Sequence, residues 1–512
     1  MKRWIFLILV GIVLTCYGIA KILVQKEMEF IDAGKVVVIF VIGFTCIVLG
    51  LIFLNKRNME LFIEATDDRM KNKKNVNVKS LIFDKTIYDK GPKIVAIGGG
   101  AGLNTVLAGM KRYTDNITAI VAVSEYGKQP NLSRAVLGTT LPFEEVKDSI
   151  VALSASTQEG EMDRLFNYKF TEGRLRNLTF ADIYFSAMKN VNKDFADSII
   201  KSNEVLNIVG KVLPVTLDEM NITAELQNGY LVTEKSKIPE VVYDRVTKIN
   251  RIYLNPTNCR PAPGVIDAIK NADCIIVGPG SLYTNVIPNL LVNGVSRAIR
   301  ESKAVKLYVC NIMTEPGLTD NYSVADHVNA IVDHCGEGLI DYCLYDTGEV
   351  IPEYIKKYNL DGAELVEQNL SEIKDKKIKF IKEDMSVVKD DFVRHNSMLI
   401  ADTLIKIICD DLKFKDRQNE PEYLMMNSKL QKDKEIKKEM IRQNKNKKDG
   451  GKKPKNKSKS KFASKYSDRI ESIKHADEKA EKRKKARMLK KQTEPKKIED
   501  QEKIREMLQQ KE

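Results

Sequence analysis

The sequence predicts an α/β fold with a parallel sheet, preceded by a two-helix transmembrane hairpin and followed by a basic tail. Three observations predict this order. Two long apolar segments lie near the N-terminus. The middle of the chain contains apolar, strand-like runs that each end in glycine, serine, threonine or asparagine. Lysine dominates the residues beyond 430.

The hairpin is predicted from residues 4–24 and 36–54, within an N-terminal region of residues 1–57. Each segment is about long enough to cross a hydrocarbon core of roughly 30 Å, and backbone amides in lipid must be bonded within their own helix. Lys2 and Arg3 precede the first segment, and Lys56 and Arg57 follow the second. Because positive residues stay on the cytoplasmic side, we expect a cell-membrane protein with both termini in the cytoplasm. The alternative is a signal peptide followed by a buried helix.

The basic tail accounts for the positive charge of the chain. Residues 431–512 contain 30 Lys and Arg against 15 Asp and Glu, or +15, whereas the whole chain carries +13. The preceding residues therefore sum to about −2, so the basic pI indicates no basic groove in the fold. We expect residues 416–512 to be largely disordered, with a conditional helix over 467–510. The tail is expected to contact anionic lipid; RNA, or no fixed partner, are alternatives.

Cysteine and histidine usage argues against a metal site. The eight cysteines form no C-x-x-C pair, and only four histidines are present, so a zinc or di-iron site is not expected. Cys274 and Cys310 lie within apolar runs, where a thiol serves as a small hydrophobic side chain. This usage is typical of a reduced, cytoplasmic compartment.

A glycine-rich loop opens the predicted α/β domain, which we assign to residues 91–415 after a linker at 58–90. Lys93–Ile97 predicts a buried strand that leads into Gly98–Leu103; helical spacing follows, and Ile117–Val123 predicts a second strand. This order places the glycines at the carboxyl end of a parallel strand, where backbone amides at a helix N-terminus bind phosphate. A tight packing turn is the alternative. The loop lacks the G-x-x-x-x-G-K-[ST] pattern, which disfavours a P-loop ATPase.

Two further strand–loop units are predicted to reach the same edge. Cys274–Val277 leads into Gly278–Thr284, and Val305–Cys310 leads into Asn311 and the residues after it. In an open parallel sheet, ligands bind at that edge. Glu125 follows the second strand and is the candidate catalytic or metal-facing carboxylate, whereas His327 is interpreted as structural. The predicted ligand-binding residues are Gly98, Gly99, Gly100, Ala101, Gly102, Leu103, Glu125, Gly278, Gly280, Ser281, Tyr283, Thr284, Asn311 and Thr314.

At these loops, over about residues 92–410, the sequence resembles the gluconeogenesis factor (YvcK-type) family of the CofD-like phospholactate transferases. The motifs that support it are Gly98–Leu103, Gly278–Thr284 with Pro288–Val292, and Tyr308–Thr314 followed by Asp326–Val328. The resemblance implies a Rossmann-like three-layer fold and a site for a uridine diphosphate sugar, with UDP-N-acetylglucosamine the expected ligand. It also implies a role linking carbon metabolism to cell-wall synthesis and cell shape.

Three segments depart from that family's pattern. The family's Ala-Asp-Asp-Gly-Gly-Ser motif is replaced by Ser124–Pro130, in which only Glu125 and Gly127 keep its chemistry. Its Pro-Gly-Asp-x-Arg-Asn stretch becomes Phe143–Asp148, which keeps charge at Glu145 and Lys147, and its Gly-His-Ser-x-Gly-Asn motif becomes Asn177–Asp182. Transfer of a phosphate-linked group needs a carboxylate or metal clamp. The changes therefore favour ligand sensing over catalysis.

Three functions are consistent with the sequence. The first is a membrane-anchored regulator that binds a nucleotide sugar, acts through a protein partner in cell-wall or carbon metabolism, and forms a homo-oligomer. The second is an active transferase that uses Glu125 and a divalent metal. The third is a membrane scaffold that binds no ligand and acts through its basic tail.

Overall fold

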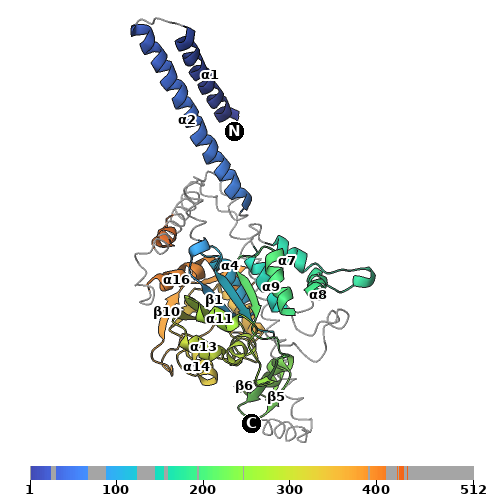
Figure 1. Cartoon of the computed structure of the whole chain (residues 1–512). Coiled ribbons are helices and arrows are strands. Elements are labelled where there is room, and N and C mark those ends of the chain that lie inside the picture. Colours follow the sequence, from blue (N-terminus) through green and yellow to red (C-terminus); the bar gives the residue numbers. More distant parts are fainter. Residues whose placement is uncertain are drawn as a thin grey trace, which may run out of the picture. The chain divides into compact units, whose positions relative to one another are not determined.

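The computed structural model describes residues 2–24, 30–66, 88–123, 144–154, 160–192, 195–245, 247–389, 392–410, 424, 426–431 and 435. Three parts of the sequence predictions lie outside these residues: Glu125 with the rest of Ser124–Pro130, Phe143, and the predicted tail helix at 467–510. The chain divides into two compact units, an N-terminal hairpin and an α/β unit (Figure 1).

Two long apolar helices form the hairpin. They are α1 (Lys2–Val24) and α2 (Phe30–Thr66). Within them, Trp4–Ile22 and Gly34–Asn55 are long and apolar enough to cross a membrane. The outer faces expose large apolar side chains such as Phe6 and Phe44. Such faces suit a lipid environment better than water.

Glycines allow the two helices of the hairpin to approach closely. Gly11 of α1 and Gly43 of α2 are both buried, and a Cβ built on Gly43 would lie 3.0 Å from the Gly11 carbonyl oxygen. Gly50 meets Ile8 in the same way, with a built Cβ only 2.4 Å from the Ile8 Cγ1 atom. Small residues at a helix interface let the backbones pack by van der Waals contact where lipid removes the hydrophobic driving force.

We therefore expect Gly43→Leu to separate α1 from α2, at a cost of about 1–3 kcal/mol, because the added atoms overlap backbone. Spin labels on the exposed Leu9 and Leu49, read by double electron–electron resonance in lipid nanodiscs, should report a longer and broader distance. Gly34→Leu is the control, since a Cβ there meets nothing within 4 Å. Equal distance distributions for the two variants would contradict the packing.

A seven-stranded parallel sheet forms the centre of the α/β unit, in the order β10-β9-β8-β7-β1-β2-β3. A three-stranded antiparallel sheet, β5-β4-β6, and a hairpin, β11-β12, accompany it. The strands are β1 (Ile94–Gly98), β2 (Ile117–Val121), β3 (Lys211–Pro214), β4 (Asn221–Leu226), β5 (Leu231–Val232), β6 (Ile249–Asn255), β7 (Cys274–Val277), β8 (Val305–Val309), β9 (Tyr342–Asp346), β10 (Lys379–Glu383), β11 (Ser386–Lys389) and β12 (Phe392–His395).

Helices cover both faces of the parallel sheet, which gives three layers (Figure 1). Alternate residues of β1 enter different cores: Val95 and Ile97 belong to one, and Ile94 and Ala96 to the other. Because both faces of the strand are buried, its sequence is an unbroken run of apolar residues. The first core includes residues of α11 (Val265–Lys270), α12 (Ile287–Leu291), α13 (Val295–Glu301) and α14 (Val324–Cys335); the second includes residues of α4 (Gly100–Met110), α6 (Glu144–Leu153), α8 (Phe180–Asn192), α9 (Phe195–Val205) and α16 (Ser397–Asp410).

The expected α/β fold with a Rossmann-like parallel sheet is confirmed. The predicted strand Cys274–Val277 is β7, and the predicted Val305–Cys310 strand is β8, which ends one residue earlier. The remaining helical segments are α7 (Glu161–Phe166), η2 (Gly173–Leu175), η3 (Lys235–Lys237), α10 (Ile238–Arg245), η4 (Leu282–Val286) and α15 (Pro352–Leu360).

Candidate functional site at the sheet switch point

The strand order reverses between β1 and β7. The chain leaves β1 through α4 toward β2, and leaves β7 through α12 and α13 toward β8 on the other side. In doubly wound sheets, the crevice outside the carboxyl ends of two such strands is the usual ligand site. Gly98 ends β1, and Gly278 follows β7, so both predicted glycine loops lie at this point.

The two glycine loops pack backbone against backbone. A Cβ built on Gly280 would lie 2.6 Å from the Gly99 carbonyl oxygen, and one on Gly102 would lie 2.9 Å from the Pro279 carbonyl. Asn311, after β8, holds the second loop: its Oδ1 accepts from the Gly280 amide at 3.0 Å, and its Nδ2 donates to the Gly280 carbonyl at 2.9 Å. The glycines therefore allow the two loops to pack closely against each other.

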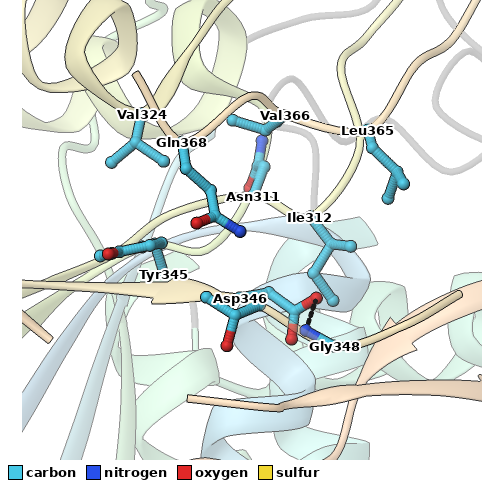
Figure 2. A pocket seen from close by; sticks show the side chains of 10 residues that line it. Asn311, Ile312, Val324, Tyr345, Asp346, Gly348, Leu365, Val366 and Gln368 are labelled. Carbon is cyan, nitrogen blue, oxygen red and sulfur yellow. Dashed lines mark hydrogen bonds between the residues drawn. The ribbon is translucent and has the colours of Figure 1, made fainter. Parts of the chain in front are cut away.

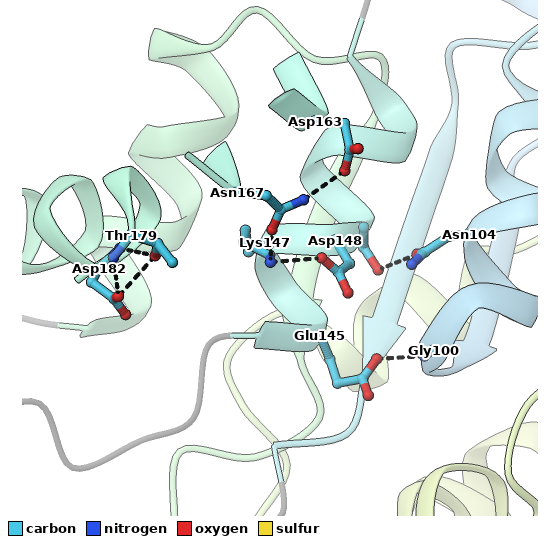
Figure 3. A network of polar contacts seen from close by, with 10 residues as sticks. Gly100, Asn104, Glu145, Lys147, Asp148, Asp163, Asn167, Thr179 and Asp182 are labelled. Atoms are coloured by element: carbon cyan, nitrogen blue, oxygen red, sulfur yellow. Dashed lines mark hydrogen bonds and ion pairs between the residues drawn. The ribbon is translucent and has the colours of Figure 1, made fainter. Parts of the chain in front are cut away.

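Glu145 reaches the α4 N-terminus from α6. The Gly100 amide donates to Glu145 Oε2 (Figure 3). Asn285 Nδ2 donates to Glu145 Oε1 at 3.3 Å. Burial raises the pKa of Glu145, against the Gly100 hydrogen bond, which lowers it. The sequence singled out Glu145 only as a retained charge, so the structure adds it to the site.

Lys235 reaches Asn285 from the subdomain that contains the antiparallel sheet β5-β4-β6. It begins η3, is only 4% exposed, and donates to Asn285 Oδ1 at 3.4 Å. Burial lowers its pKa to about 8, although the nearby carboxylates of Glu145, Glu144 and Glu315 act in the opposite direction. A buried ammonium beside two glycine loops is suited to an anionic ligand group. Nothing in the local sequence around Lys235 predicts this position.

Ser281 and Glu315 complete the group. The Ser281 hydroxyl donates to Glu315 Oε2 at 2.6 Å, and burial raises the pKa of Glu315. We call Glu145, Lys235, Asn285, Ser281 and Glu315, together with the two glycine loops, the switch-point cluster. Within the described residues, no group of three or more His, Cys, Asp or Glu side chains could hold a metal ion.

The other predicted residues contribute in different ways. Ala101 is exposed in the first turn of α4, whereas the Leu103 side chain is fully buried in the core. The Tyr283 hydroxyl lies 2.7 Å from the Tyr322 hydroxyl, and both rings are buried. The Thr314 amide donates to the Glu364 carbonyl at 2.7 Å, and its hydroxyl accepts from the Glu364 amide at 2.8 Å. Thr314 thus joins two chain segments.

Two buried polar groups beside the loops have unused hydrogen-bonding capacity. Asn289 Nδ2 donates to the Gly98 carbonyl at 2.8 Å, but Asn289 Oδ1 has no partner among the described residues. The Thr284 hydroxyl is buried and likewise lacks a partner among those residues. Buried groups of this kind are uncommon and call for a ligand or water.

His327 occupies a structural position, in agreement with its interpretation from the sequence. It is fully buried in α14, and its Nδ1 lies 2.9 Å from the Ser323 carbonyl oxygen. Burial lowers its pKa to about 4, so it is neutral at physiological pH. His334 and His395 also pair with backbone carbonyls, of Ala330 and Cys310.

A small cavity of about 60 Å³ adjoins the switch-point cluster (Figure 2). It lies at the carboxyl ends of β8 and β9 and shares Asn311 with the second glycine loop. Asp346 lines it; the carboxylate accepts from the Gly348 amide at 3.1 Å and the Met385 amide at 2.6 Å. The cavity has room for only a few water molecules. The remaining lining residues are Ile312, Val324, Tyr345, Thr347, Leu365, Val366 and Gln368.

The fold and the cluster define a doubly wound α/β protein with a candidate ligand site at its switch point. The family model for 2-phospho-L-lactate transferase CofD matches residues 94–386, and the chain belongs to this family. A putative gluconeogenesis factor of Clostridium acetobutylicum is 39% identical, covering 86% of this chain and 96% of the relative.

Shorter relatives cover the chain less fully. The gluconeogenesis factor of Bacillus subtilis is 36% identical, covering 62% of this chain and 98% of its own length. A crystal structure of a UPF0052-family protein from Bacillus halodurans superposes with a TM-score of 0.56 at 36% identity, covering 60% of this chain and 98% of that one. The family expected from the motifs is thereby confirmed.

Proposed function

We propose that this protein is a membrane-anchored regulator that binds a nucleotide sugar, with UDP-N-acetylglucosamine as the first ligand to test. The observation that carries the proposal is the meeting of two glycine loops at the switch point beside one buried ammonium, Lys235. A diphosphate offers several acceptor oxygens and negative charge, which backbone amides at a helix N-terminus and an ammonium group bind well.

Binding without turnover is supported by the chemistry of the described residues. Both carboxylates of the switch-point cluster have hydrogen-bond partners: Glu145 bonds with Gly100 and Asn285, and Glu315 with Ser281. The three described histidines are buried, and burial lowers the pKa of each, which makes each a weak proton acceptor. The segments that carry the family's acidic and histidine motifs differ here at Ser124–Pro130 and Asn177–Asp182.

Anchoring to the cell membrane is supported by α1 and α2, which are long and apolar enough to cross it. Lys2, Arg3, Lys56 and Arg57 flank the spans and favour a cytoplasmic α/β domain. The relatives' description as gluconeogenesis factors supports a link to carbon metabolism. A connection to cell-wall synthesis and cell shape, through a protein partner, belongs to the same proposal.

Calorimetry on the full chain in lipid nanodiscs tests the proposal. We expect saturable binding of UDP-N-acetylglucosamine, with weaker binding of a guanosine diphosphate sugar and none of free N-acetylglucosamine, which lacks the diphosphate. Empty nanodiscs provide the control for lipid binding. Absence of binding at millimolar concentration of every nucleotide sugar would overturn the proposed function, and hydrolysis or transfer products would favour the transferase alternative.

A further inference from the structure

The α4 N-terminus is occupied by a side chain of the protein itself. The Gly100 amide has one hydrogen to donate, and it donates to Glu145 Oε2. A Cβ built on Gly99 would lie 3.1 Å from the same oxygen, so the carboxylate lies against the loop where a ligand would approach it. A ligand phosphate cannot bond to this amide while Glu145 remains there.

The charges of the cluster also oppose an incoming anion. Among the described residues, the charged groups that act on Lys235 are the carboxylates of Glu145, Glu144 and Glu315. Like charges close together in a partly buried site repel strongly, because water screens them poorly. Withdrawal of one carboxylate would therefore favour the entry of a diphosphate.

Only the Glu145 side chain has to move for this to happen. Glu145 lies in the first turn of α6, and the body of that helix is fixed by the buried Val146 and Ile150. The Ser149 hydroxyl also donates to Asn104 Oδ1 at 3.1 Å, which joins α6 to α4 (Figure 3). Rotation of one side chain therefore leaves the helix packing unchanged.

We propose that Glu145 is an internal competitor for the phosphate site: a ligand's diphosphate displaces its carboxylate from the Gly100 amide and replaces it as the counter-ion of Lys235. This inference rests on the proposed function. It assigns Lys235 as the ligand-facing cation and Glu145 as the residue that sets how much negative charge a ligand must carry to bind. The buried Thr284 hydroxyl, in η4 after Gly280, has no partner among the described residues and could serve as a further donor.

Glu145→Gln and Glu145→Ala test the proposal in the full chain in nanodiscs, with UDP-N-acetylglucosamine and inorganic pyrophosphate as probes. The glutamine keeps the shape and removes the charge, and the alanine removes the competing group. We expect both to bind each probe on the order of 10-fold more tightly than the wild type. Glu144→Gln and Glu144→Ala are the matched controls, because Glu144 also acts on Lys235 and lies in the same turn, whereas the Gly100 amide donates to Glu145. They remove one negative charge but release no amide, so they should tighten binding clearly less than the Glu145 variants do.

Lys235→Met tests the other half of the pair. We expect it to weaken binding of both probes by on the order of 10-fold, whereas Lys237→Met should leave affinity unchanged, because Lys237 is exposed and pairs with Glu234. Circular dichroism and a melting curve establish that each variant is folded before its affinity is compared.

The possible results separate the two proposals. If the wild type binds and the Glu145 variants bind equally or more weakly, the displacement is wrong while the proposed function stands; weaker binding would indicate that Glu145 holds the ligand, directly or through a metal. If neither the wild type nor any folded variant binds either probe, both proposals are overturned. The displacement is supported only if both Glu145 variants bind the probes more tightly than the wild type does.

Discussion

Gly280→Ala should lower the free energy of unfolding by about 2–3 kcal/mol and abolish nucleotide-sugar binding. The added methyl group would lie 2.6 Å from the Gly99 carbonyl oxygen, and both atoms belong to backbone that cannot rotate away. Movement of the second loop would also strain the two hydrogen bonds by which Asn311 holds the Gly280 amide and carbonyl. The two loops must therefore separate, which displaces the α4 N-terminus from the cluster.

Urea unfolding followed by circular dichroism, together with calorimetry, measures both effects. Gly173→Ala is the control: Gly173 has φ +69°, but a Cβ there meets nothing within 4 Å. It carries only the cost of a left-handed backbone, roughly 1 kcal/mol, and should leave binding unchanged. Wild-type stability and affinity in Gly280→Ala would show that the loops do not need this contact.

In the wild type, Lys235 should raise the free energy of unfolding by about 3 kcal/mol between pH 8 and pH 10.5, and Lys235→Met should abolish this rise. Burial lowers the pKa of Lys235 from 10.5 to about 8. Between these pH values the unfolded chain binds a proton that the folded chain does not, so Lys235 makes wild-type stability rise with pH. Below pH 8 the folded protein bears the full cost of a buried ammonium.

The measurement compares variants, because other groups titrate in the same range. Urea unfolding of the α/β domain is followed from below pH 8 to pH 10.5 in wild type, Lys235→Met and the exposed control Lys237→Met. The difference in free energy of unfolding between the wild type and Lys235→Met should grow in favour of the wild type across this window. The difference between the wild type and Lys237→Met should stay constant. Parallel pH profiles for all three proteins would refute the buried charge. Among the described cysteine and tyrosine side chains, burial raises the pKa values of Cys259, Cys310, Cys335, Cys343, Cys409, Tyr184, Tyr283, Tyr308 and Tyr322.

Much of the fold follows from local patterns. Strands buried on both faces, such as Cys274–Val277, appear as unbroken apolar runs because helices cover both sides of the sheet. The strand predicted at Ile117–Val123 ends at Val121, because sheet pairing with β3 stops at Pro214. Residues 122 and 123 stay buried without extending the strand.

The candidate site was predictable in part. Parallel strands bring their carboxyl ends to one edge, so the loops at Gly98 and Gly278 and the side chain of Asn311 had to meet there. Whether a residue in such a loop points outward depends on packing. Leu103 and Tyr283 turn into the cores, and Thr314 joins backbone segments.

The sequence by itself determined the apolar hairpin, the parallel sheet and the edge at which the glycine loops gather, because each depends on local periodicity and on the common direction of parallel strands. Only the tertiary structure decided which charges share that edge. Glu145 and Lys235 are 90 residues apart and come from different subdomains, and Asn285 lies between them. No spacing rule pairs such residues, since their approach depends on how the antiparallel subdomain packs against the central sheet. That packing places a carboxylate on the loop that was expected to receive a phosphate.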